Sequence, residues 1–165
     1  MISSVAEFVK YFDGIRRRTA VAVERVTPEV AAYRPRPSEW TCAEIVRHIS
    51  GAERFFVTKV VEDRFTTDLD LGPSEPWDVT LRRLDDVHSY EMARLAALPD
   101  ARLHEKVKDL DGGSVSRWRF LMAMVEHEVH HRSQLDSWLA LAGTEAPQIY
   151  GYTMEDVVAK VGAQA

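Results

Sequence analysis

Cysteine is almost absent from this chain of 165 residues, in which Cys42 is the only one. No disulfide can therefore form within the chain, and nothing in the sequence requires an oxidising compartment. Long apolar runs are also lacking, since there is no stretch of about 18 apolar residues that could cross a membrane. The first residues lack the unbroken apolar stretch of a secretory signal. We expect a cytoplasmic protein with no membrane partner.

Positive charge is likewise in short supply. Acidic residues outnumber lysine and arginine, and the formal net charge is -5. Nucleic-acid binding is not expected, because it depends on many basic side chains that neutralise phosphates. The one basic run is Arg16, Arg17 and Arg18, on successive faces of a predicted helix. We interpret this run as a solvated surface in preference to a phosphate site.

Helical periodicity is what the sequence has in abundance. Apolar residues recur at steps of three and four in four segments, which are residues 5–26, 41–60, 81–98 and 116–142. Thr41 and Glu44 have the spacing of a capping box at the start of the second segment. Gly143 suits the C-terminal cap of the fourth segment. Four amphipathic helices with little strand signal predict an all-α fold, a four-helix bundle in a single domain of residues 1–165.

The connections between these helices carry turn-forming residues. Residues 66–76 are rich in Asp, Gly, Ser and Pro and predict a loop. Residues 103–115 alternate around Asp111-Gly112-Gly113, which predicts a short hairpin or irregular loop before the fourth helix. A short further helix is expected from Thr153, where Asp156 stands at the capping-box spacing.

Three histidines occupy positions that the helical pattern assigns to the core. The predicted core stripe of the fourth helix is Phe120, Met124, His127, His131, Leu135, Trp138 and Ala142. His127 and His131 stack on one helix face at a separation of four residues, close enough to bind one ion. His48 has a similar position on the second helix, between Ile45 and Ala52. Because buried imidazoles need partners, we predict a divalent metal bound by His48, His127 and His131. The alternative is that they hydrogen bond to carbonyls, carboxylates or buried water.

For other polar residues near the three histidines, the sequence indicates a role less directly. His130 lies at the flank of the stripe, which favours a supporting or surface role, and His88 is interpreted as a half-buried structural histidine that could also line a pocket. Glu53 lies at the edge of an apolar face, where it could orient a metal-bound histidine or take a proton from bound water. The alternative interpretation is that Glu53 lies on the surface and forms an ion pair with an arginine. Glu126 and Glu128 are expected to be solvated.

Three neutral ligands leave at least one coordination position of the ion open, which is typical of catalytic sites and not of closed structural ones. Such an ion can lower the pKa of bound water or bind a substrate thiolate. Imidazole ligands suit zinc, nickel, copper or iron. We predict zinc or nickel, because the sequence shows no Asp or Glu placed to bind the ion directly, which would favour non-haem iron.

A family resemblance rests on the run His127-Glu128-Val129-His130-His131-Arg132-Ser133-Gln134-Leu135, together with Glu44-Ile45-Val46-Arg47-His48-Ile49 and Trp40 before it. These residues resemble the DinB/YfiT-like bundles, from the first helix to Ala142. Family members often have glycine at the position of Ser133, a small change that leaves the ligand positions intact. The resemblance implies an up-down-down-up bundle, a three-histidine site and a homodimer. It also implies kinship to S-transferases of low-molecular-weight bacterial thiols and to a mycothiol-dependent isomerase.

Three functions are compatible with these features. The first is a metal-dependent thiol S-transferase, in which a low-molecular-weight thiol reacts with a small electrophilic substrate. The second is a hydrolase that uses metal-bound hydroxide, with Glu53 as a proton acceptor. The third is a non-enzymatic metal-binding stress-response protein. None of them requires Cys42, which we interpret as a packing residue at the start of a helix.

Overall fold

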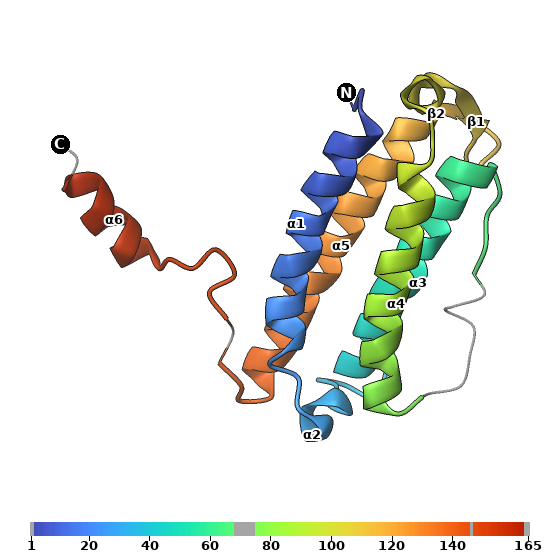
Figure 1. The fold of residues 1–165 in the computed structure, drawn as a ribbon. Helices are drawn as coiled ribbons and strands as arrows, with labels where there is room; N and C mark the ends of the chain where they lie inside the picture. Colours follow the sequence, from blue (N-terminus) through green and yellow to red (C-terminus); the bar gives the residue numbers. More distant parts are fainter. Residues whose placement is uncertain (1, 68–74, 146, 164–165) are drawn as a thin grey trace.

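Four long helices form the body of the protein in a computed structural model, which describes residues 2–67, 75–145 and 147–163. They are α1 (Val5–Val23), α3 (Cys42–Glu62), α4 (Trp77–Ala96) and α5 (Arg117–Leu141). Followed along the chain in Figure 1, α1 runs from the upper end of the bundle to the lower end, α3 and α4 run back up, and α5 runs down. The predicted all-α four-helix bundle is confirmed. None of the helices in the described residues is both long and apolar enough to span a membrane.

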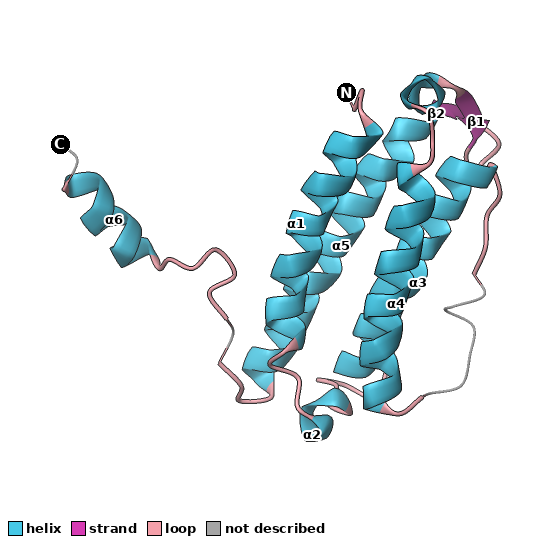
Figure 2. Cartoon of the chain, in the orientation of Figure 1, coloured by secondary structure: helices cyan, strands magenta, loops and turns pink. Residues whose placement is uncertain are grey.

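Short elements connect the long helices (Figure 2). A single helical turn, α2 (Pro28–Ala31), follows α1 and was not predicted from the sequence. The 3-10 helix η1 (Asp100–His104) and the strands β1 (Lys106–Lys108) and β2 (Ser114–Ser116) lie between α4 and α5. The strands pair antiparallel with Val107 opposite Val115, so the predicted hairpin is confirmed. Of the loop predicted at residues 66–76, residues 68–74 lie outside the described part of the chain.

Side-chain caps fix where several helices begin. Thr41 and Glu44 form the predicted capping box of α3, because the Thr41 hydroxyl accepts from the Glu44 backbone N–H while the Glu44 carboxylate accepts from that of Thr41. Thr153 and Asp156 form the same arrangement at the start of α6 (Met154–Gly162). Gly143 follows α5 with a φ of 80°, a left-handed conformation that favours glycine. These local signals were all readable from the sequence.

The buried apolar residues fall into two clusters, one at each end of the bundle. The cluster at the upper end in Figure 1 includes Phe8, Phe12, Val57, Leu95 and Leu121. The cluster at the lower end includes Val46, Ile49, Leu84, Leu135 and Leu139. The parts of α1, α3, α4 and α5 between the two clusters contain the charged residues and histidines of the middle of the bundle. We call this level the polar layer, defined by Arg16, His48, Glu53, His88, His127, Glu128 and His131.

Candidate metal centre

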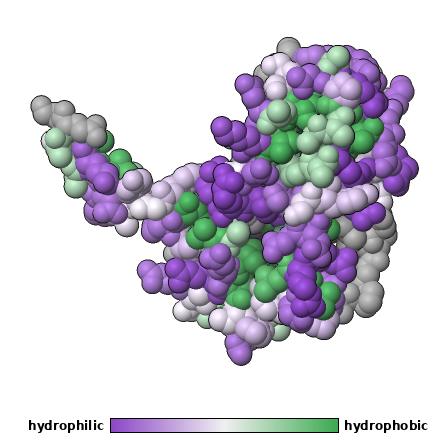
Figure 3. Space-filling model, viewed as in Figure 1, coloured by the Kyte–Doolittle hydropathy of each residue, from purple (hydrophilic) through white to green (hydrophobic). Residues whose placement is uncertain are grey.

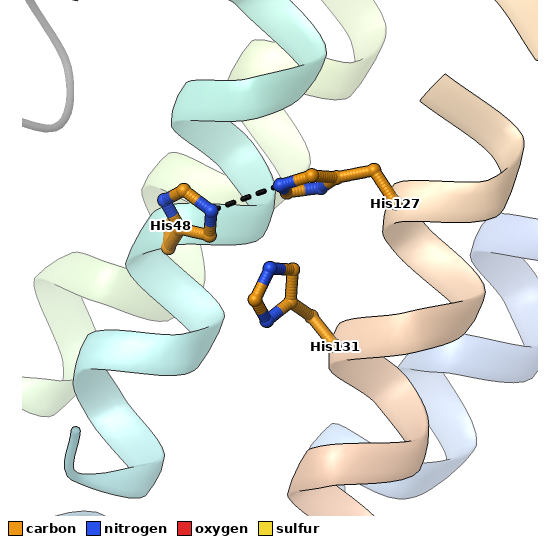
Figure 4. A group of neighbouring side chains, drawn as sticks. All are labelled: His48, His127 and His131. Atoms are coloured by element: carbon orange, nitrogen blue, oxygen red, sulfur yellow. Dashed lines mark hydrogen bonds between the residues drawn. The ribbon is translucent and has the colours of Figure 1, made fainter. Parts of the chain in front are cut away.

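Histidines from two neighbouring helices converge in the polar layer. His48 extends from α3, and His127 and His131 extend from α5, one turn apart (Figure 4). One ring nitrogen from each residue can be chosen so that all three lie within 4.8 Å of one another. The Nε2 atoms of His48 and His127 are 2.9 Å apart. The structure thus brings together the three residues that the sequence analysis singled out.

The spacing of these nitrogens fits a single ion. Nitrogens bound at zinc distances in a tetrahedral site lie about 3.3 Å from one another. The 2.9 Å separation between His48 and His127 and the 4.8 Å upper limit for the group lie on either side of that value. The separations are therefore of the size that binding of one ion by all three rings requires. All three donors are neutral imidazoles, which suit zinc, nickel, copper or iron.

Supporting residues fix the orientation of the rings. The Nδ1 atom of His131 lies 2.9 Å from the Oε1 atom of Gln134, one turn further along α5. Because the amide oxygen only accepts, Nδ1 carries the hydrogen, and Nε2 is the nitrogen with a lone pair for an ion. The Trp40 ring packs on the rings of His48 and His131, with centroids 4.5 and 5.6 Å away. The Trp40 carbonyl in turn accepts a hydrogen bond from Trp138 Nε1 on α5.

The histidines are less deeply buried than the helical pattern predicted. His127 and His48 are half-buried, and the most buried face of α5 is Leu121, Met124, Val125, Glu128, His131, Arg132, Leu135 and Leu139. This face is turned by about 60° from the predicted stripe, with which it shares Met124, His131 and Leu135. The stripe was misplaced because the true centre of the face contains the charged residues Glu128 and Arg132. As a consequence, His48 and His127 lie where the core meets the surface, and His131 lies just beneath them.

Glu53 is fully buried and belongs to a chain of charged contacts behind the histidines. Its carboxylate is paired with the guanidinium of Arg16 on α1, and its Oε1 atom lies 2.8 Å from Nδ1 of His88 on α4. Arg16 also contacts Glu128 Oε2 at 2.9 Å, and His88 Nε2 lies 3.2 Å from Asp13 Oδ1. Glu53 is thus paired to an arginine, but in the core and not on the surface.

Two sequence-based expectations about charged residues were wrong. Arg16 is buried, although the run Arg16–Arg18 was expected to be solvated, and only its neighbour Arg17 is exposed. Glu128 is buried as well, and burial raises the pKa of its carboxyl group while the nearby Arg16 opposes that rise. The other expectations for this region hold, because Glu126 and His130 are exposed and His88 is half-buried.

Comparison with known proteins identifies the family. The family model described as the DinB superfamily matches residues 11–135, which is more than half of the chain. The chain belongs to the DinB superfamily. Over its whole length it is 25% identical to the uncharacterized protein YrdA of Bacillus subtilis, of which it covers 98%.

Two solved structures share the DinB-like fold. A DinB-like protein from Bacillus cereus has a TM-score of 0.76 at 20% identity, with 89% of this chain and 98% of that one covered. The DinB-like protein YjoA from Bacillus subtilis has a TM-score of 0.70 at 22% identity, with 87% and 96% covered. At these identities the similarity establishes the fold alone, so the chemistry of this DinB-superfamily protein has to be argued from its own residues.

The single cysteine of this DinB-superfamily protein is shielded from reagents. Cys42 is fully buried in the first turn of α3, and burial raises the pKa of its thiol to about 11. Only about one thiol in a thousand is then ionised at pH 8, and the thiolate is the reactive form. We expect the folded protein to react with a disulfide reagent such as dithionitrobenzoate far more slowly than the urea-unfolded protein does. Equally fast release of the coloured product in both states would contradict the burial.

Proposed function

We propose that the protein is a metal-dependent enzyme of the thiol S-transferase type, which joins a low-molecular-weight thiol to a small electrophile. The observation that carries this proposal is the convergence of three neutral imidazoles at the edge of the core. Three protein ligands leave a coordination position for an outside molecule. Because none of the three carries negative charge, a bound divalent ion would keep its full positive charge for an anionic ligand such as a thiolate.

The bound ion, for which zinc or nickel is our proposal, would supply stabilisation of a thiolate at neutral pH. The chain's own residues have different tasks. Gln134 holds His131 by its Nδ1–H, so that Nε2 faces the site. Trp40 covers one side of His48 and His131 and offers an aromatic surface that is partly exposed to solvent. A planar electrophile could stack there beside the attacking sulfur.

The reaction also needs a thiol, and the chain's own cysteine is unsuited to supply it. Cys42 is fully buried, and its raised pKa keeps it protonated. A separate thiol molecule must then bring the sulfur. In the transfer, the thiolate forms a sulfur–carbon bond to the electrophile while the bond to the leaving group breaks, and the thiol proton goes to solvent.

The contacts of Glu53 favour the transferase over the hydrolase. A hydrolase of this kind would use a carboxylate close to the metal-bound water as a base. The hydrogen-bonding partners of Glu53 are Arg16 and His88 in the interior of the bundle. We therefore propose that Glu53 supports the site by joining α3 to α1 and α4, and its role as a base stays a prediction.

The test is an assay for conjugation of chlorodinitrobenzene, an electrophile whose chloride is displaced by sulfur. The protein loaded with zinc or nickel is offered cysteine, glutathione or mycothiol in turn. We expect product formation above the uncatalysed rate with at least one thiol, and at least a tenfold loss in the His48→Ala variant. The matched control is His130→Ala, which changes an exposed histidine next to the site.

Three outcomes would count against the proposal. Equal rates for His48→Ala and wild type would mean that the histidine site takes no part in the reaction. Hydrolysis of ester substrates without any thiol, together with no conjugation, would favour the hydrolase. Absence of both activities and a lower melting temperature after chelation would favour a metal that only stabilises the bundle.

A further inference from the structure

The C-terminal helix α6 carries an apolar face that the described residues of its own chain leave uncovered. Met154, Val157, Val158 and Val161 follow the helical spacing of three, four and seven residues, and their exposed fractions range from 43% to 72%. None of the residues of α6 is buried by any part of the chain that the structure describes. In Figures 1 and 3 the helix stands well away from the bundle, and it displays both apolar and polar side chains.

A helix in this situation requires a partner. α6 has 9 residues, and isolated helices shorter than about 12 residues are marginal in water even with good sequences. Its capping box at Thr153 and Asp156 favours helix formation but contributes only about 1 kcal/mol. Most helical stability in proteins comes from packing of an amphipathic face. The stripe on α6 is therefore a surface suited to packing against an apolar groove.

Such a groove lies on the outer side of the bundle, between α1 and α5. Tyr11 on α1 and Met122 on α5 line the same surface pocket of about 200 Å³. Both are exposed, as is Val129, which follows Met122 on α5 by seven residues and so lies on the same helix face. Met154 and Val161 are also seven residues apart, so both apolar rows span two turns, about 10 Å.

The charges at the edge of the groove match those of α6. Lys10 and Arg18 of α1 line a shallow pocket next to Tyr11, at whose other end lies the acidic Glu7. The first turn of α6 carries Glu155 and Asp156, which flank the apolar stripe. An α6 helix that lies along α1 can thus place its acidic turn near basic side chains while its valines contact Tyr11, Met122 and Val129. This complementarity also favours one orientation of the helix over its reverse.

The course of the chain before α6 favours a groove on another molecule. The ring of Tyr150 packs on the guanidinium of Arg18, 5.7 Å from its carbon, so the chain passes its own α1 at one end of the groove. Beyond this contact it continues away from the bundle (Figure 1). Two copies related by a twofold axis can each fill the groove of the other, which doubles the buried apolar area.

We propose that α6 docks in the groove between α1 and α5 of a second copy of this chain, and that the second copy returns its own α6 in the same way. The contact surface is formed by Met154, Val157, Val158 and Val161 on one side and by Tyr11, Met122 and Val129 on the other. This gives the homodimer expected from the family resemblance a defined surface, and it does not depend on the proposed enzymatic function.

The first test measures the mass of the full-length protein by light scattering during size exclusion at micromolar concentration. We expect a dimer for the wild type and monomers for the Val157→Asp and Val129→Asp variants, each of which introduces a charge on one side of the contact. The matched control is Leu110→Asp, which changes an exposed apolar residue in the hairpin and should leave the dimer intact. A wild-type monomer, or a dimer that survives both groove and helix variants, overturns the proposal.

A second test separates docking between copies from docking within one chain. Tyr11→Cys and Val157→Cys are introduced together and oxidised, while Cys42 is fully buried and does not compete. We expect a band at twice the chain mass on non-reducing gels. A disulfide formed within single chains would mean that α6 folds back onto its own α1, and no disulfide at all would mean that α6 binds elsewhere. Either result contradicts the exchange between copies.

Discussion

The His131→Ala variant is expected to lose the bound metal almost completely. In the wild type, each chain should retain about one equivalent of zinc or nickel after dialysis, as three histidine ligands do in catalytic sites. His131 is the most buried of the three histidines, and its Nδ1 is already held by Gln134. Elemental analysis of the two purified proteins, without an affinity tag, measures the difference.

Two further variants test whether the loss of metal is specific to His131. His130→Ala should retain the metal, because His130 is exposed and directed away from the buried face of α5. Gln134→Ala should retain the ligands but bind the ion about 10–100-fold more weakly, the usual cost of losing a supporting hydrogen bond. Loss of metal in His130→Ala together with full occupancy in His131→Ala would mean that the ligand assignment on α5 is wrong.

The Arg16→Met variant is expected to be the most destabilised single substitution in the polar layer. Arg16 is the shared partner of the buried carboxylates of Glu53 and Glu128. Its removal leaves both without their cation, and breaking a buried ion pair on one side costs about 3–5 kcal/mol. Urea denaturation of the metal-free protein at pH 7.5 measures the change in the free energy of unfolding. Arg17→Met is the matched control, and at this exposed site the change should stay within about 0.5 kcal/mol.

The pH dependence of Arg16→Met provides a second measurement. Burial raises the pKa of the Glu128 carboxyl group, and Arg16 opposes this rise, so the substitution should raise that pKa further. A carboxyl whose pKa is higher in the folded than in the unfolded state stabilises the fold at pH values below the unfolded pKa. That stability is lost as the pH increases through the folded pKa. The deficit of Arg16→Met should therefore be smaller at pH 5 than at pH 7.5. A deficit that does not change with pH would argue that lost packing is its cause.

Helix positions and their caps could be predicted because they depend on neighbouring residues. The capping boxes at Thr41 and Thr153 each need only a residue three positions away, and both are present in the structure. The stacking of His127 and His131 follows from the helical repeat in the same way. Even His48, on another helix, could be proposed as their partner, because a histidine within an apolar stripe is unusual. The sequence alone thus identified the fold and the three candidate ligands.

The depth of each residue, in contrast, was decided only when the helices packed together. Periodicity arguments assign charged side chains to solvent, so Arg16 and Glu128 were expected at the surface and Glu53 at the edge of a face. In the bundle they come from α1, α5 and α3, and Arg16 pairs with both carboxylates, which favours their burial. The sequence pattern of a single helix does not predict this burial, because each charged residue pairs with a residue on a different helix. The same packing turned α5 so that the histidines lie at the edge of the core.

The sequence by itself therefore determined the four long helices, the caps at Thr41 and Thr153 and the group of three histidines, since these follow from spacing within a helix. The tertiary structure decided which charges form the interior of the bundle and that Gln134 and Trp40 orient the histidine rings. It also decided that the described residues of the chain leave the apolar face of α6 uncovered. The physical reason is that burial and pairing are properties of several segments at once. They are fixed by which helix faces meet, and a single amphipathic pattern does not contain that information.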